Sequence, residues 1–170
     1  MQLIRCTKKF QRRLGLTKED LQEHEPDEGV LGSWHANLIE VAESSAILCA
    51  NDRTLLNFFI DIDPEGPVRH FNMNFVAMLS CVLADLGIPE TTREHLLEEY
   101  REIRFAPTNN RRVIGSMNDL AFHYDYLVSE SGSIHSAEVS GIIRNLNGMP
   151  MSMLPEISPD RPLLALLRDL

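Results

Sequence analysis

The sequence predicts an α+β fold, with a small, mainly antiparallel sheet covered on one face by four or five helices. Two observations support this prediction. Residues 34–62 contain consecutive segments of β-forming residues separated by turn signals, and the last of them alternates apolar with polar residues. The segments that follow, within residues 69–148, repeat apolar residues at helical spacing. Because a sheet with an apolar face must be covered, we expect these helices to pack on it.

One domain is expected over residues 1–170, since a chain of 170 residues buries roughly two-thirds of its unfolded surface without metal or disulfide support. The domain divides into a strand-rich part at 1–62, a helical part at 69–148, and a proline-rich segment with a tail helix at 149–170. The leucine-rich tail is expected to dock on the domain, with binding to a partner as the alternative.

The secondary structure is predicted from periodicity and breakers. Strands are expected at residues 2–7, as an edge strand, and at 34–41, 46–50 and 56–62. Helices are expected at residues 8–14, 71–86, 91–103, 116–128, 139–146 and 163–170. Residues 105–114 are expected to form a loop or a short strand. A change of phase at 38–39 predicts a bulge, which would put His35, Asn37 and Glu40 on one face.

Helix starts are predicted from pairs of residues at capping-box spacing. Such pairs occur at Thr17 with Asp20, Thr91 with Glu94, and Ser116 with Asp119. The last pair predicts that the helix at 116–128 begins at Ser116.

Composition limits the classes of function. No run of about eighteen apolar residues is present and the first residues lack a secretory signal, so no membrane span and a cytoplasmic location are expected. The three cysteines form no Cys-x-x-Cys pair and are expected to be buried thiols, so neither a metal site nor a disulfide framework is predicted. Dinucleotide, phosphate-loop, zinc-protease and serine-hydrolase motifs are absent, and no cofactor is expected.

The charge is unevenly distributed along the chain. The formal net charge is -9, which disfavours nucleic acid as a partner. Residues 1–18 nevertheless hold six basic side chains and no acidic ones, and residues 19–28 hold six acidic and no basic ones. We expect these blocks to attract each other, with a basic docking patch for a polyanion as the alternative.

Two polar clusters lie on or between the predicted strands. His35 and Asn37 would point to the same face and could hold a ligand, although His35 could equally bond a loop carbonyl. Asn51, Asp52 and Arg53 lie at a turn, where Asn and Asp side chains normally bond their own backbone, so a binding role is the second interpretation.

A third polar cluster leads into a predicted helix. Two arginines and several amides near a helix N-terminus would favour an anion, whereas a capping box would explain Ser116 without any ligand. The candidate binding residues of this cluster are Asn109, Arg111, Arg112, Ser116 and Asn118.

Several segments together resemble a family of small bacterial proteins classed as a domain of unknown function. They are LGSWHANL at 31–38, NDRTL at 51–55, TN at 108–109, VIGSMNDL at 113–120 and NLNGMPMS at 145–152. The resemblance implies a single domain of bacterial, cytoplasmic origin. It implies no reaction, substrate, cofactor or catalytic residue.

We therefore expect a non-catalytic binding or regulatory module for a protein partner or a small anionic ligand, with the oligomeric state left open. The alternative is a small enzyme acting on a phosphorylated or nucleotide-like ligand through a pocket of His, Asn and Arg side chains. That alternative requires His35, Asn37, Asn109 and the arginines to converge on one pocket.

Overall fold

The computed structural model describes residues 2–22, 29–62, 68–151 and 158–167. Its strands are β1 (Gln2–Cys6), β2 (Trp34–Val41), β3 (Ser44–Asn51), β4 (Asn57–Asp61) and β5 (Ile103–Pro107). Its helices are α1 (Lys8–Leu14), α2 (Val68–Asp85), α3 (Glu90–Glu98), the short 3-10 helix η1 (Glu99–Arg101), α4 (Arg111–Glu130), α5 (Val139–Asn147) and α6 (Asp160–Leu166). The α+β class is confirmed. No helix in the described part of the chain is long and apolar enough to cross a bilayer.

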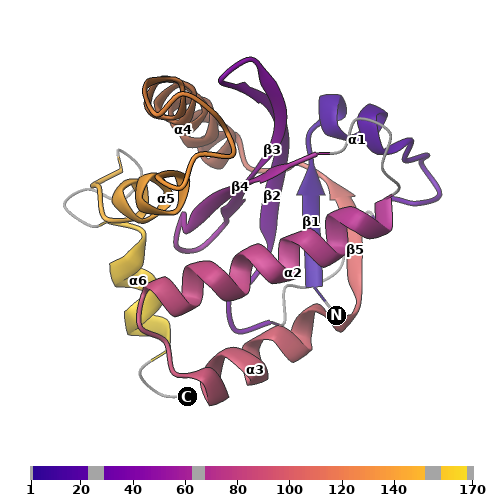
Figure 1. The fold of residues 1–170 in the computed structure, drawn as a ribbon. Coiled ribbons are helices and arrows are strands. Elements are labelled where there is room, and N and C mark those ends of the chain that lie inside the picture. The colour runs from indigo at the N-terminus through magenta and orange to yellow at the C-terminus, as the bar shows by residue number, and fades with distance from the viewer. Residues whose placement is uncertain (1, 23–28, 63–67, 152–157, 168–170) are drawn as a thin grey trace.

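The five strands form one mixed sheet in the order β4-β3-β2-β1-β5 (Figure 1). Strands β2, β3 and β4 are antiparallel neighbours, but β1 runs parallel to both β2 and β5. The prediction of a mainly antiparallel sheet is therefore wrong, and so is the prediction that the first strand lies at an edge. Long connections that contain helices precede β2 and β5, and such crossovers allow parallel pairing.

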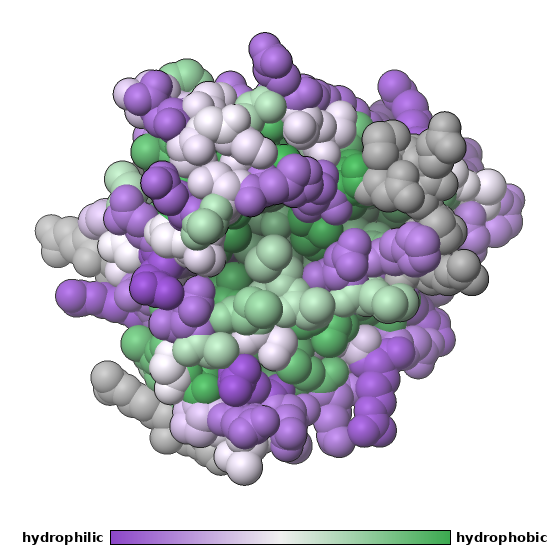
Figure 2. All heavy atoms as spheres, in the orientation of Figure 1, coloured by the Kyte–Doolittle hydropathy of each residue, from purple (hydrophilic) through white to green (hydrophobic). Residues whose placement is uncertain are grey.

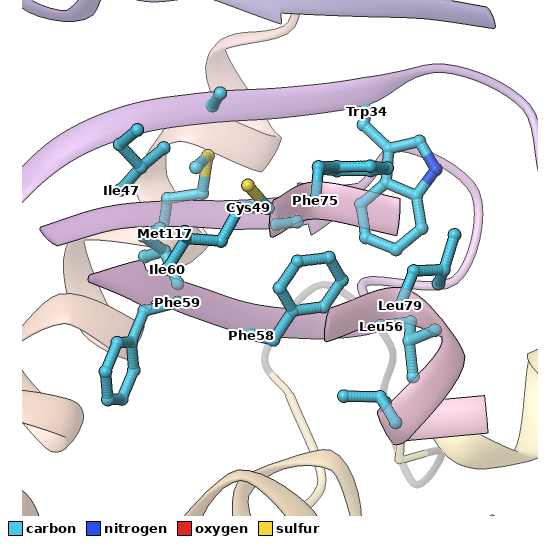
Figure 3. Packing of buried hydrophobic residues seen from close by; sticks show 14 of the residues in the cluster. Trp34, Ile47, Cys49, Leu56, Phe58, Phe59, Ile60, Phe75, Leu79 and Met117 are labelled. Atoms are coloured by element: carbon cyan, nitrogen blue, oxygen red, sulfur yellow. The ribbon is translucent and has the colours of Figure 1, made fainter. Parts of the chain in front are cut away.

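Helices cover both faces of the sheet, which corrects the prediction of cover on one face. Phe58 and Phe59 are neighbours on β4 and point in opposite directions (Figure 3). The ring of Phe58 lies 5.4 Å from that of Phe75 on α2, whereas the ring of Phe59 lies 5.1 Å from that of Tyr124 on α4. Strands β3 and β4 are buried on both sides, and a sheet of that kind needs a helix layer on each side.

The predicted bulge in β2 is also wrong. Pairing with β3 is continuous from Trp34 opposite Asn51 to Val41 opposite Ser44. The phase change arises because apolar residues occur on both faces of β2, at Trp34, Ala36 and Leu38 on one and at Ile39 and Val41 on the other. The hairpin turns at Ala42 and Glu43, whose φ angles of 47° and 64° are typical of a two-residue type I′ turn.

None of the three predicted capping boxes starts a helix. Helix α4 begins five residues before Ser116, and α3 begins after Pro89 without a side-chain cap. The third pair makes its local bond, with the amide of Thr17 donating to Asp20 Oδ2 at 2.8 Å, but in a turn.

The remaining cysteine and tail predictions are partly confirmed. Cys6 and Cys49 are buried, whereas Cys81 is exposed, contrary to prediction. In the tail, Leu163 is fully buried in the core and Leu164 is 39% exposed. The predicted extension of this helix to Leu170 lies outside the described residues.

Candidate functional site

Four polar residues lie beneath the N-terminus of α4, and we call them the His35 cluster. His35 is on β2, Asp52 follows β3, and Asn110 is the N-cap of α4. Asp52 Oδ1 lies 3.4 Å from His35 Nε2 and accepts a 2.9 Å hydrogen bond from Asn110 Nδ2. The fourth member, Arg5 on β1, pairs with His35 in the sheet register. The cluster thus joins the sheet to the start of α4.

The His35 cluster is mostly inside the protein and is not an open binding site. His35 has no exposed surface, and neither ring nitrogen makes an ordinary hydrogen bond to the described residues. At 3.4 Å, its contact with Asp52 is longer than the roughly 2.7–3.2 Å of an N–H···O bond, so we treat it as electrostatic. This contact is the largest cause that lowers the pKa of Asp52, and Asn110 and Arg5 act in the same direction, while burial opposes them.

Replacing Asp52 with asparagine tests this electrostatic role. Because the folded-state pKa of Asp52 is lowered, its ionised form stabilises the fold above the ordinary carboxyl value of 3.8, and that stability is lost as pH falls through the folded pKa. At pH 7 we expect D52N to lower the free energy of unfolding by about 1–2 kcal/mol. Urea unfolding between pH 7 and pH 2.5 should show this difference shrinking below about pH 4. The exposed Asp119, changed to asparagine, is the control, and a pH-independent D52N effect would contradict the prediction.

A surface depression, which we call the α4 depression, lies beside the His35 cluster. Its volume is about 450 Å³, and its lining residues are Thr108, Asn109, Asn110, Arg111, Ile114, Gly115 and Asn118. Asn110 Oδ1 already accepts hydrogen bonds from the backbone amides of Arg112 and Val113. An anion bound in the α4 depression would therefore contact mainly side chains, because these two backbone amides of the helix N-terminus are already bonded.

Only some of the predicted binding residues share one place. Asn109, Arg111 and Asn118 line the α4 depression, and Asp52 reaches it through Asn110. Arg112 is exposed and is not part of the lining, and Ser116 is buried against the core. Ligand binding by Asn109, Arg111 and Asn118 remains a prediction.

The other predicted binding residues have structural partners. Asn37 shares the face of His35, as predicted, and its Oδ1 accepts a 2.8 Å hydrogen bond from Thr7 Oγ1. Asn51 is buried and donates to the carbonyl of Leu31 at 2.7 Å. Arg53 donates to the carbonyls of residues 29 and 30. The last two contacts hold the loop before β2 against the β3–β4 turn.

Two members of the His35 cluster were absent from the predicted site. Arg5 is a charged residue on a buried strand, and that mismatch was an available signal. Asn110 is a residue type strongly preferred at helix N-caps, and it was overlooked because the cap was assigned to Ser116.

A second concave feature, which we call the α1–α2 hollow, lies between α1, α2 and the end of β4. Its volume is about 290 Å³. It is lined by Arg13, Leu14, Ile47, Ile60, Asp61, Ile62, His70, Phe71, Met73 and Asn74. Figure 2 shows hydrophobic residues gathered in a recess beside α2 on this face of the molecule. Four separate segments build the hollow, so no local sequence pattern marks it.

The described residues offer little for covalent or metal chemistry. Burial raises the pKa of the Cys6 and Cys49 thiols, which keeps them protonated and unreactive. No group of three or more His, Cys, Asp or Glu side chains suited to a metal ion occurs in the ranges that the structure describes.

Comparison with known proteins gives a family and no activity. Neither curated proteins nor solved structures provide a match to the chain. A family model, described as a domain of unknown function (DUF6933), matches residues 3–161. That match covers nearly the whole chain and confirms the resemblance at the level of an uncharacterised family. The chain therefore belongs to the family described as domain of unknown function DUF6933.

Proposed function

We propose that this chain is a non-catalytic binding protein whose ligand site is the α1–α2 hollow. The observation that carries the proposal is the make-up of this hollow. Its apolar wall comes from Ile47 and Ile60 on the sheet and Leu14 and Phe71 on the helices, and polar side chains lie among its other lining residues. Small-molecule sites usually combine an apolar lining with a few polar groups that orient the ligand.

The enzyme alternative has less support from the geometry. His35 is fully buried, so it can act on a ligand only through Asp52. Asn37 is bonded to Thr7, and Arg112 lies outside the α4 depression. The side chains that an enzyme of this kind would need therefore do not converge on one ligand-binding pocket.

A neutral fluorescent probe tests the proposal. The probe is N-phenyl-1-naphthylamine, whose emission increases when it leaves water for an apolar site. We expect saturable binding to the wild-type protein at one site per chain. Asn74 is exposed on α2 and lines the hollow, so N74W should fill the entrance and weaken probe binding at least tenfold.

The matched control is A84W, which places the same side chain at an exposed position on α2 away from the hollow. We expect it to bind the probe like the wild type. Circular dichroism and thermal unfolding of both variants establish that the fold is intact. Non-saturable binding, or equal binding by N74W and the wild type, would overturn the assignment of the site.

A further inference from the structure

We infer that the exposed face of α4 binds the same face of a second copy of this chain, with the two helices antiparallel. We call this face the α4 stripe, and its exposed residues are Arg111, Arg112, Gly115, Asn118, Asp119, Phe122, His123, Tyr126 and Glu130. Helix α4 lies at the outside of the molecule (Figure 1). It packs on the opposite side of the sheet from α2 and the α1–α2 hollow, so the inference does not depend on the function proposed above.

Two aromatic side chains are exposed in the middle of the α4 stripe. Phe122 is 71% exposed and Tyr126 is 60% exposed. They are four residues apart on the helix, so their rings are neighbours and form one apolar patch. Aromatic side chains are enriched at the centres of protein–protein interfaces, where they contribute much of the binding energy. This patch is therefore the expected centre of an interface.

Gly115 leaves space for an aromatic ring on the same stripe. It lies in the interior of α4, where glycine is much less favourable than alanine. Beyond the backbone of α4 itself, a Cβ added at Gly115 would meet no atom of the described residues within 4 Å. Packing within the chain therefore does not require glycine here. Gly115 also lines the α4 depression, and a residue without a side chain allows a second molecule to approach the helix closely.

The charges of the α4 stripe are arranged so that the stripe complements itself. Arg112 and Glu130 are about five full turns apart, so they lie on the same side of the stripe, near opposite ends of α4. Among the ion pairs of the described residues, none involves either of them. In an antiparallel pair with a two-fold axis at Ala121, Arg112 of each copy faces Glu130 of the other. A parallel pair would place like charges together, so charge selects the antiparallel arrangement.

The same two-fold axis accounts for the other features of the stripe. It places Tyr126 of one copy over Gly115 of the second, where the α4 depression provides a volume of about 450 Å³. It also brings Asp119 opposite His123 and sets Phe122 beside its own copy at the axis. Charge, ring and glycine thus fit one arrangement, and the partner that this surface fits is the chain itself.

Sedimentation velocity of the full chain between about 1 and 300 µM tests the dimer. We expect a reversible equilibrium between monomer and dimer with a Kd of about 10–50 µM, since a pair of 20-residue helices makes a small interface. F122S removes the ring nearest the two-fold axis from both copies and should weaken the dimer at least about thirtyfold. M73S is the matched control, because Met73 is 67% exposed but lies on α2, and it should leave the Kd within about twofold of the wild type.

Charge reversal tests the antiparallel arrangement. At low ionic strength R112E and E130R should each weaken the dimer about tenfold, because the contact occurs twice in each dimer and becomes repulsive. The double variant R112E/E130R restores opposite charges and should return the Kd to within about threefold of the wild type. Each change also gives its end of α4 the charge that the helix dipole favours, so weaker association would not reflect a damaged fold.

G115Q separates dimerisation from stability of the fold. Glutamine is a better helix former than glycine and meets open space in the single chain, so the thermal midpoint at about 1 µM protein should rise by about 1–3 °C. The same side chain would occupy the position of Tyr126 of the second copy, and the dimer should weaken about tenfold. Association that G115Q leaves unchanged would contradict the contact between Tyr126 and Gly115.

Three further results would overturn the inference. A wild-type chain that stays monomeric at about 300 µM would mean that no second copy binds the stripe. A dimer that F122S leaves intact, or that M73S weakens, would use another surface. Single charge reversals without rescue in the double variant would mean that the helices are not antiparallel. N74W is expected to dimerise like the wild type, so the dimer and the proposed ligand site can fail independently.

Discussion

Replacing Trp34 with alanine is expected to lower the free energy of unfolding by about 3–5 kcal/mol. Trp34 is fully buried at the start of β2, and its ring lies 5.4 Å from that of Phe58 and 5.2 Å from that of Phe75. Its Nε1 also donates a 2.7 Å hydrogen bond to the hydroxyl of Tyr100. Alanine would leave a cavity where β2, β4 and α2 meet, and surrounding side chains of a packed core relax only partly into such a space.

The W34F variant separates ring packing from the hydrogen bond. Phenylalanine keeps an aromatic ring beside Phe58 and Phe75 but cannot donate to Tyr100, so a cost of about 1–2 kcal/mol is expected. Trp34 is the one tryptophan of the chain, so urea unfolding must be followed by circular dichroism. If W34A is unfolded without denaturant, W34F still gives a measurable value. A cost below about 1 kcal/mol for W34A would show that this cluster is not the centre of the core.

Local periodicity was enough to predict most of the secondary structure. Strands β2, β3 and β4 and helices α1, α2, α4 and α5 lie where their patterns placed them, with errors mainly at the ends. The start of α4 was misplaced because Ser116 and Asn110 are both residue types that occur at N-caps, and spacing alone favoured Ser116. In the structure Asn110 is the N-cap, and its Nδ2 also donates to Asp52.

The sheet order depended on contacts that no local pattern contains. Residues 103–107 carry only five strand residues, and they pair with β1, which lies about a hundred positions earlier in the chain. The two-faced burial of β2 gave apolar residues at both odd and even positions, and this was interpreted as a bulge in a one-faced strand.

The meeting of His35 and Asp52 could have been predicted from the hairpin. With the turn placed at Ala42 and Glu43, residue 35 lies opposite residue 50, so residue 52 is beyond the start of β2 and within reach. The predicted strands at 34–41 and 46–50 instead placed the turn within residues 42–45, and the register was not used. The α1–α2 hollow is different in kind, since its lining comes from segments whose arrangement depends on the whole sheet.

Changing Asn147 to alanine is expected to lower the free energy of unfolding by about 3–4 kcal/mol, because several buried polar groups would lose their partners together. The side-chain amide of Asn147 forms hydrogen bonds with the backbone amide and carbonyl of Asn57, in the place where a neighbouring strand would do so. Its Oδ1 accepts from the Asn57 amide at 2.9 Å, and its Nδ2 donates to the Asn57 carbonyl at 2.7 Å. Asn147 thereby closes part of the edge of β4 with a helix.

The same network includes Tyr124, and this provides a matched comparison. Tyr124 donates from its hydroxyl to Asn57 Oδ1 at 2.7 Å, and Asn147 Oδ1 also accepts from Asn57 Nδ2 at 3.1 Å. The Y124F variant removes one hydrogen bond and should cost about 1–2 kcal/mol. Because both variants act on Asn57, the double variant should cost less than the two single costs together, by at least about 0.5 kcal/mol.

Urea unfolding of the two single variants and the double variant measures this coupling. Additive costs would mean that Tyr124 and Asn147 hold Asn57 independently. A cost of N147A no larger than that of Y124F would mean that water replaces the amide at the strand edge. Additive costs would contradict the predicted coupling through Asn57, and the second result would contradict the role of Asn147 as the partner that closes the edge of β4. A helix side chain that completes a strand edge is instead expected to be costly to lose, since alanine leaves both the amide and the carbonyl of Asn57 without a partner.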